Sequence, residues 1–348
     1  MIMKKMFLFA AMASVAFANC TTDEKVFDGT DESNEIRFTA AQYSAQSRAE
    51  HDTDVAFTDQ ITIWSWYSET NTQVIPGDVY QYNGTSGSFS SGNKYYWPTN
   101  GKALDFVAVP KNLVGSAYFT APGRAADGAT ALTFVIPNGN DYHSTNLMTT
   151  ELVKNQTSGT IALLFRHLLS KVQIKVEQGK RETLDARWLV TVNDIKVSGL
   201  KCAGQVVINQ AWDATANSAT GCSWDDVSGS ETWQVTTAAK ALYASINSGA
   251  EKTDYNSAAT YYMLPQELVD QEITINYTVE TDFLGNPTQP NTSKTYEKEI
   301  KLNTAGISQW YMNKNIVYTI TINPEDVTEI TFTVNEEEWG GGSGSGSI

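Results

Sequence analysis

The stretch Lys171–Val176 reads KVQIKV, so that polar and apolar residues alternate along it. Successive side chains of a β-strand point to opposite faces, and a period of two therefore predicts a strand with one buried face. The same alternation occurs in ITIWSW at 61–66, ITINYT at 273–278 and VYTITI at 317–322. These runs are short and rich in β-branched and aromatic residues, which favour strands. We therefore expect an all-β protein.

Polar segments separate these runs, as in NGTSG at 83–87, and Gly, Asn and Ser clusters of this kind are typical of turns. Many short strands in a chain of 348 residues indicate β-sandwiches, most simply two of them. The polar segment NQTSG at 155–159 is the expected boundary between an N-terminal sandwich, 49–158, and a C-terminal one, 159–339. One short helix is expected at 237–247.

The composition excludes several classes of function. Acidic residues outnumber basic ones by 39 to 24, and the formal net charge of −15 opposes binding to nucleic acid. Three cysteines and three histidines are too few for a disulfide scaffold or an obvious metal centre, and whether Cys202 and Cys222 pair stays open. We interpret EHDTD at 50–54 as a solvated loop and His167 as a packed residue of a strand. No catalytic residues, metal or cofactor are therefore expected.

The N-terminus predicts export. Lys4 and Lys5 precede an apolar run of 13 residues, 6–18, which is too short to span a membrane and is typical of a signal peptide at 1–19. Cleavage could follow Ala18, or Cys20 could become the lipidated first residue of a lipoprotein, and we favour lipidation. Residues 20–48 would then form a tether. At the other end, the Gly- and Ser-rich residues 340–348 are expected to be flexible.

Two segments near the ends of the mature chain, 36–40 and 330–334, have the same apolar pattern. Alternate side chains of a strand share a face, so each segment would present an Ile, a Phe and a small aliphatic residue to one groove. One segment could then replace the other. The shared positions are Ile36, Phe38 and Ala40 in the first segment and Ile330, Phe332 and Val334 in the second.

A polar linker, 41–58, follows the first segment and contains one arginine, Arg48, before Ala49. Exposed loops are preferred sites of proteolysis, and an arginine-specific protease would release residues 20–48. A sheet without this strand could accept a strand from another molecule. On the residues alone, however, chance similarity of two strands and an ordinary loop arginine are the stronger explanation.

Several motifs in order along the chain resemble those of the fimbrillin family of Bacteroidales, the FimA-like and Mfa-like subunits of type V pili. Each motif is weak alone, but their order is fairly specific, and the resemblance spans most of the chain. The motifs are YYWP at 95–98, LDFVAVP at 104–110, FRHLLSKV at 165–172, LPQ at 264–266 and the closing segments 310–322 and 330–339.

This resemblance implies two tandem transthyretin-like β-sandwich domains and an outer-membrane lipoprotein precursor. It also implies cleavage at Arg48-Ala49 by an arginine-specific protease, and polymerisation by strand exchange with a donor region at 327–339. The partners would be other pilin subunits, that protease, and host or bacterial surface ligands in adhesion. The protein would end as a fimbrium on the cell surface.

A second hypothesis is a monomeric surface lipoprotein that binds glycans. The aromatic clusters WSWY at 64–67 and YYW at 95–97 could stack on sugar rings, although aromatic residues in strands more often build a core. A secreted hydrolase ranks last, because no convergent acid and base residues are visible.

Overall fold

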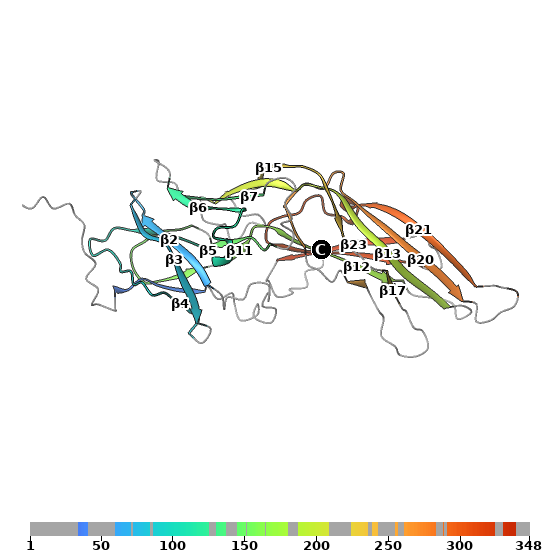
Figure 1. Ribbon diagram of the computed structural model, residues 1–348, viewed down its shortest axis with the longest axis horizontal. Coiled ribbons are helices and arrows are strands. Elements are labelled where there is room, and N and C mark those ends of the chain that lie inside the picture. Colours follow the sequence, from blue (N-terminus) through green and yellow to red (C-terminus); the bar gives the residue numbers. More distant parts are fainter. Residues whose placement is uncertain are drawn as a thin grey trace, which may run out of the picture.

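The computed structural model confirms the all-β prediction: apart from short 3-10 turns, the regular elements of its described residues are strands. Several sheets follow one another along the long axis of an elongated molecule (Figure 1). The described residues are 34–40, 60–70, 72–83, 86–124, 130–136, 145–150, 152–163, 165–179, 187–208, 224–235, 239–242, 255–256, 261–282, 288, 291–323 and 330–338.

The largest sheet has seven strands in the order β10-β1-β4-β3-β2-β5-β9. Its strand β2 is apolar on both faces, because Ile61 and Ile63 face one core cluster whereas Trp64 and Trp66 face another. The strands are β1 (Arg37–Ala40), β2 (Gln60–Tyr67), β3 (Gln73–Asn83), β4 (Ser88–Ser90), β5 (Leu104–Pro110), β9 (Val153–Gln156) and β10 (Thr160–Leu163).

Two smaller sheets join parts of the chain that lie far apart in sequence. A four-stranded sheet has the order β15-β14-β7-β6, and β8 pairs with β11. The strands are β6 (Phe119–Arg124), β7 (Thr130–Ile136), β8 (Met148–Thr150), β11 (Phe165–His167), β14 (Ala203–Ile208) and β15 (Trp224–Ser228).

Strand pairing crosses the boundary that we expected at 155–159. β9 and β10 flank this segment, and both belong to the seven-stranded sheet. In addition, β14 from the second half of the chain pairs with β7 from the first half. A polar break in the sequence marks a turn here, with Asn155 and Gly159 at positive φ, but the sheet continues on both sides of it.

Two five-stranded sheets enclose the largest core cluster at the other end of the molecule. In β12 and β22, buried and half-buried residues alternate without exception, and the two strands pair in parallel. The first sheet contains β12 (Ser170–Gln178), β18 (Tyr255–Asn256), β19 (Tyr261–Met263), β22 (Lys314–Ile322) and β23 (Ile330–Glu338). The second contains β13 (Arg187–Leu200), β16 (Glu231–Gln234), β17 (Lys240–Leu242), β20 (Glu272–Asp282) and β21 (Thr292–Lys301).

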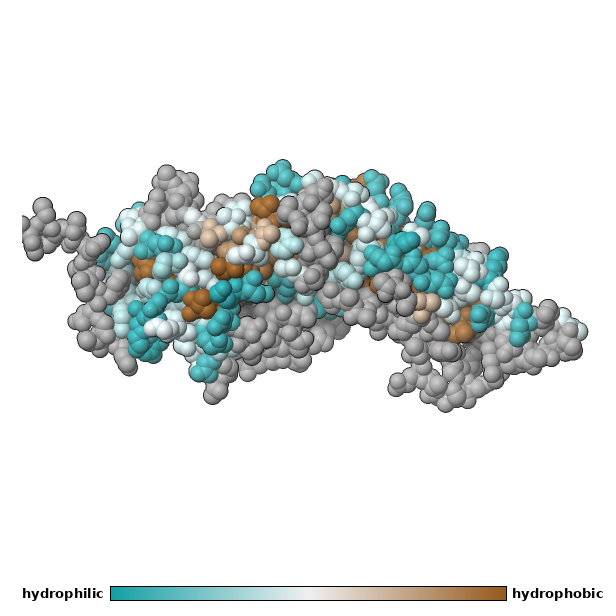
Figure 2. Space-filling model, viewed as in Figure 1, coloured by the Kyte–Doolittle hydropathy of each residue, from teal (hydrophilic) through white to brown (hydrophobic). Residues whose placement is uncertain are grey.

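The prediction of a helix at 237–247 is wrong for the part of this segment that the structure describes, because β17 pairs there with β13. The edge strand β21 is mostly exposed and carries alternating charges, and Figure 2 shows a hydrophilic surface over it. Charged side chains on an edge strand oppose pairing with other chains.

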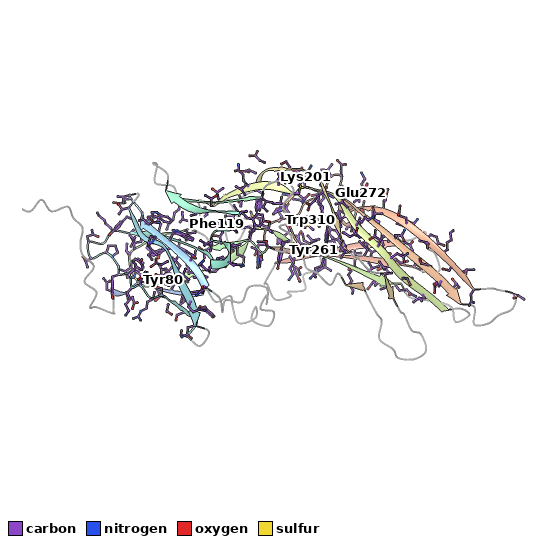
Figure 3. All side chains as sticks on the ribbon, in the orientation of Figure 1. Tyr80, Phe119, Lys201, Tyr261, Glu272 and Trp310 are labelled. Atoms are coloured by element: carbon purple, nitrogen blue, oxygen red, sulfur yellow. The ribbon has the colours of Figure 1, made fainter. Side chains whose placement is uncertain are left out.

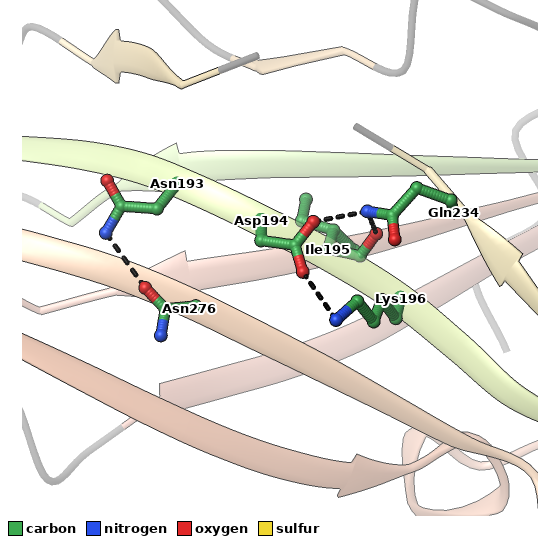
Figure 4. Close-up of polar contacts among 6 residues, drawn as sticks. All are labelled: Asn193, Asp194, Ile195, Lys196, Gln234 and Asn276. Carbon is green, nitrogen blue, oxygen red and sulfur yellow. Dashed lines mark hydrogen bonds and ion pairs between the residues drawn. The ribbon is translucent and has the colours of Figure 1, made fainter. Parts of the chain in front are cut away.

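A β-bulge in β13 places Asn193 outside the regular register with β20. Its side-chain amide donates hydrogen bonds to Asn276 Oδ1 and Thr278 Oγ1, each at 2.9 Å. The neighbouring Asp194 accepts a hydrogen bond from Gln234 of β16 and lies 3.2 Å from Lys196 Nζ (Figure 4). These polar contacts connect three neighbouring strands at the surface of the sheet.

A further core cluster joins the two ends of the molecule. It contains Trp64 and Phe119 from the first half of the chain and Leu264 and Met312 from the second. Figure 3 shows Phe119 between Tyr80, within the seven-stranded part, and Trp310, within the part that β12 and β22 build. Since this cluster is apolar and buried, it fixes the two parts against each other.

Candidate functional site

The strand β1, which contains the segment predicted to be removable, lies inside the seven-stranded sheet. It pairs in parallel with β10 and antiparallel with β4, so Phe38 lies opposite Ile161 on one side and Phe89 on the other. Phe38 is fully buried, and Ile36 is 5% exposed. Ala40 ends the strand opposite Leu163, and its side chain lies outside the described residues.

The ring of Phe38 is held by edge-to-face contacts. Its centroid lies 5.2 Å from that of Tyr80 and 5.6 Å from that of Phe106. Trp97 contacts Phe106 in the same way, at 5.7 Å. Such pairs add about 0.5–1.5 kcal/mol to the effect of burial. Phe38 is therefore the central apolar contact between β1 and the sheet.

Residues 34–36 extend this pairing beyond β1. The backbone N–H of Ile36 donates to Tyr95 O at 2.8 Å, and the N–H of Trp97 donates to Asn34 O at 3.0 Å. The side-chain amide of Asn34 also donates to Trp97 O at 3.0 Å. A second ladder thus binds the start of the segment to 95–97, within the YYWP motif.

The position of β1 has a consequence for its neighbours. Among the described strands, β10 pairs with β1 alone, and β4 lies between β1 and β3. Removal of β1 would therefore leave the facing backbone groups of β4 and β10 without strand partners, beside an apolar slot. The geometry describes a groove that one strand fills.

Charged and polar side chains line one end of this groove. Asp78 accepts hydrogen bonds from Asn93 Nδ2 at 2.6 Å and from the Tyr95 hydroxyl at 2.7 Å. Burial, and then the hydrogen bond to the Asp78 carboxylate, raise the pKa of Tyr95 well above its ordinary value. Burial likewise raises the pKa of Tyr80 to about 12. Both phenols are therefore neutral hydrogen-bonding groups at physiological pH.

The C-terminal segment lies at the other end of the molecule, in the edge strand β23. Among the described strands it pairs with β22 alone, antiparallel, from Ile330 opposite Ile322 to Glu338 opposite Lys314. Ile330, Phe332 and Val334 are half-buried and pack against the large core cluster. In its own sheet, this segment therefore has one strand neighbour, whereas β1 has two.

Specific contacts hold β23 to β22. The ring of Phe332 stacks on that of Tyr318, with centroids 5.3 Å apart and planes 4° apart. The amide of Asn315 donates to Glu337 at 2.8 Å. Departure of β23 would break this ladder and expose part of the apolar face of β22.

Several residues singled out in the sequence belong to the core. Trp64, Trp66, Tyr96 and Trp97 are all at most 7% exposed, which confirms their interpretation as core aromatics and leaves them unavailable to stack on a glycan. His167 is buried and its Nδ1 lies 2.8 Å from Asn146 Oδ1, as expected for a packed, hydrogen-bonded histidine.

Other predictions fall outside the described residues. These include the signal peptide 1–19, Cys20, the Arg48-Ala49 step, the EHDTD run at 50–54 and the tail 340–348. Cys202 is buried, but Cys222 lies outside the described part, so their pairing is untested.

The described residues contain no group of three or more His, Cys, Asp or Glu side chains placed to hold a metal ion. Within the same ranges, no helix has both the length and the apolar character needed to cross a membrane.

A family model described as fimbrillin-like matches residues 47–339. The chain belongs to this fimbrillin-like family. Membership in a family of fimbrial proteins agrees with the expected non-enzymatic role and implies other pilin subunits as partners and a location on a surface appendage. Comparison with curated proteins gives no match.

The fold of this fimbrillin-like chain is similar to that of a solved fimbrial protein. A fimbrial protein from Bacteroides vulgatus has a TM-score of 0.57 and 18% identity, covering 88% of this chain and 99% of that one. A candidate cell adhesion protein from Bacteroides uniformis has a TM-score of 0.47 and 18% identity, covering 88% and 98%. The first comparison shows a common fold over most of both chains.

Sequence reasoning missed two features of the groove: the pairing of 34–36 with 95–97, and the identity of β10 as the parallel neighbour of β1. Both pairings join residues distant in sequence, which local alternation does not reveal. The sequence does show that the pattern shared by the two terminal segments begins one residue earlier, because Glu35 before Ile36 has a counterpart in Glu329 before Ile330.

Proposed function

We propose that this fimbrillin-like protein is a pilus subunit that is matured by cleavage after Arg48 and polymerises by donor-strand exchange. The observation that carries the proposal is the interior position of β1, with Phe38 fully buried between two strands. Arg48 lies in the chain segment that connects β1 to β2. Cleavage there separates the strand covalently from the sheet that it completes.

The proposed donor is the segment with Ile330, Phe332 and Val334 of another subunit. It repeats the apolar pattern of Ile36, Phe38 and Ala40, and β23 has one strand neighbour to leave. Each fully buried anchor supplies about 1.5–3 kcal/mol, and each backbone hydrogen bond adds about 0.5–1.5 kcal/mol. The exchange breaks the contacts of β1 with its groove and those of β23 with β22, so the difference between the contacts formed and broken sets its free energy.

The precursor is exported and anchored through its N-terminal segment. Residues 1–19 direct export, and Cys20 is lipidated and holds the precursor at the outer membrane. Cleavage after Arg48 then cuts the covalent link of both the lipid anchor and β1 to the rest of the chain, and β1 can be displaced. Coupling release to activation in this way confines polymerisation to the cell surface. Two transthyretin-like sandwich domains, as implied by the family resemblance, remain part of this proposal.

We also propose a role in adhesion, in line with the fimbrillin-like family to which the chain belongs. The alternative of a monomeric glycan-binding lipoprotein lacks a supporting surface among the described residues, because the aromatic residues that suggested it are mostly buried.

Limited digestion with an arginine-specific protease tests the proposal. The wild-type chain should lose its N-terminal segment and form filaments visible by electron microscopy. Arg48→Lys, which retains the charge but removes the cleavage site, should remain a full-length monomer. Arg37→Lys is the matched control, since Arg37 lies within β1, and it should polymerise normally. Filaments from uncleaved Arg48→Lys would contradict the proposed trigger.

A further inference from the structure

An ionic contact lies at the end of the groove where β1 begins. Glu35 forms an antiparallel bridge with Tyr96, and its carboxylate lies 3.8 Å from Lys94 Nζ. Arg37 also approaches it, at 3.7 Å. Glu35 and Arg37 both belong to the segment that cleavage after Arg48 releases, whereas Lys94 stays with the groove. The groove therefore keeps Lys94, whereas Glu35 leaves with the released segment.

The proposed donor segment supplies an acidic residue at the corresponding place. Residues 35–39 read EIRFT and residues 329–333 read EITFT, so the match includes the glutamate before the first apolar anchor. Glu-Ile also occurs at 272–273 and 299–300, but neither pair is followed by x-Phe-Thr. The two ends of the mature chain thus share a charge in addition to their apolar residues.

We propose that Lys94 is a specificity-determining residue of the groove, which favours an incoming strand with an acidic residue directly before its first apolar anchor. The occupant is residues 329–334 of a second copy of this chain. This inference rests on the proposed strand exchange and adds the partner and the register. When Ile330 is aligned with Ile36 in sequence, Glu329 corresponds to Glu35.

Exchange of the strands removes one of the two cations that lie near the glutamate and leaves Lys94. Thr331 replaces Arg37 in the incoming strand, so the second cation near Glu35 is lost. Lys94 then remains as the nearby cation for the new glutamate. The whole chain has a formal charge of −15, so two copies repel each other in general, and a local positive group at the groove opposes that repulsion.

The exposure of the two side chains sets the size of the effect. Lys94 is 51% exposed and Glu35 is 21% exposed, so water and salt screen their attraction. Such a contact changes an equilibrium or rate by a few-fold, which is enough to discriminate between competing strands but too little to drive assembly. The apolar anchors supply the affinity, and Lys94 supplies selection and register.

A charge exchange in the full-length protein tests this inference. Polymerisation of wild type, Lys94→Glu, Glu329→Lys and the double variant is followed by light scattering after digestion with the arginine-specific protease. Gel electrophoresis measures the cleavage rate separately. Each single reversal should slow assembly about fivefold at low salt, and the double variant should return to within about twofold of wild type.

Lys154→Glu is the matched control, because Lys154 is exposed in β9 at the opposite edge of the same sheet, and this variant should assemble at the wild-type rate. Lys94→Gln provides a milder change that removes the charge without introducing repulsion. Raising the salt concentration should reduce the difference between the single reversals and wild type.

Equal rates for wild type and both single reversals would overturn the role of Lys94 while leaving strand exchange intact. The role of Lys94 would also be overturned if the assembly rate of the double variant were reduced by the product of the two fold-reductions measured for the single variants. If the cleaved wild type does not assemble at all, both the proposed function and this inference fail.

Discussion

Phe38 lies directly opposite Ile161 in the parallel pair of β1 and β10, although the two residues are far apart in sequence. Phe38 is fully buried, and Ile161 is 3% exposed. Among the described strands, β10 has no other strand partner, so an element near the middle of the chain is joined to its sheet by the N-terminal strand. Loss of β1 therefore creates a vacancy inside the sheet rather than at its margin.

Phe38→Ala should destabilise the uncleaved protein by about 3–5 kcal/mol, because it leaves a cavity beside Tyr80 and Phe106. Chemical denaturation measures this loss. Arg37→Ala, on the exposed side of the same strand, should change stability by less than about 0.5 kcal/mol. Filaments of the cleaved Phe38→Ala protein should be as stable as wild type, since residue 38 is no longer present. If filaments of the cleaved Phe38→Ala protein lost as much stability as the uncleaved variant does, β1 would still be present in them.

Phe332→Ala should allow normal cleavage but greatly reduce assembly, because it removes the donor residue that corresponds to Phe38. The uncleaved protein should lose less stability than with Phe38→Ala, since Phe332 is half-buried at a sheet edge and stacks on Tyr318. Sedimentation after digestion measures assembly, and exposed Thr333→Ala is the control. Normal filaments from Phe332→Ala would exclude this side chain as an anchor.

Gly77→Ala should destabilise the seven-stranded sheet by about 2 kcal/mol or more, through backbone strain and a clash. Gly77 has a φ of +100°, and an added Cβ would lie 2.6 Å from Trp64 Nε1. Gly87→Ala is the matched control: its φ is +65°, but an added Cβ meets no atom within 4 Å, so only the strain remains. In thermal unfolding, Gly77→Ala should lower the melting temperature more than Gly87→Ala does. Equal decreases would show that the Trp64 side chain can move away from the added Cβ at little cost in free energy.

The stability of the protein should fall as the pH is lowered from about 6.5, because burial, and then the charge of Lys171, lower the pKa of His167 well below its ordinary value. In this range the unfolded chain binds a proton that the folded chain does not. The free energy of unfolding therefore falls by up to about 1.4 kcal/mol for each unit by which the pH is lowered. Chemical denaturation at several pH values should show a shallower dependence for His167→Gln. An identical pH dependence of both proteins would mean that His167 is protonated in the folded state.

The sequence was sufficient to predict the strands with one buried face. In β12 and β22, the period of two that is visible in the sequence is also the burial pattern, because each strand covers one core. Ile36 and Phe38 were assigned to the buried face of β1 by the same reasoning, and the structure agrees. Local periodicity therefore identified which side chains would be buried.

Pairing between distant strands could not be predicted in this way. The partner of β1 depends on where β10 lies after the whole sheet has formed, and the turn at 155–159 has the same local composition as a domain linker. Segment 237–247 contains good helix formers such as Ala and Lys, but backbone pairing of β17 with β13 outweighs this weak preference. The contact of Glu35 with Lys94 likewise depends on the unexpected pairing of 34–36 with 95–97.

The most direct test of strand exchange is a disulfide between subunits. Thr39 pairs with Ser88 across β1 and β4, and Thr333 corresponds to Thr39 in the proposed donor. Residues paired in this way have Cα atoms about 4.5–5.5 Å apart, within reach of a disulfide. A Ser88→Cys, Thr333→Cys variant is digested, oxidised mildly and examined on a non-reducing gel.

The Ser88→Cys, Thr333→Cys protein should form a ladder of covalent oligomers after cleavage and remain monomeric before it. A Ser88→Cys, Thr331→Cys protein, two residues out of register, should give far less cross-linking. Filaments without cross-links in the first variant, or with stronger cross-links in the second, would contradict the claim that residues 330–334 take the place of residues 36–40.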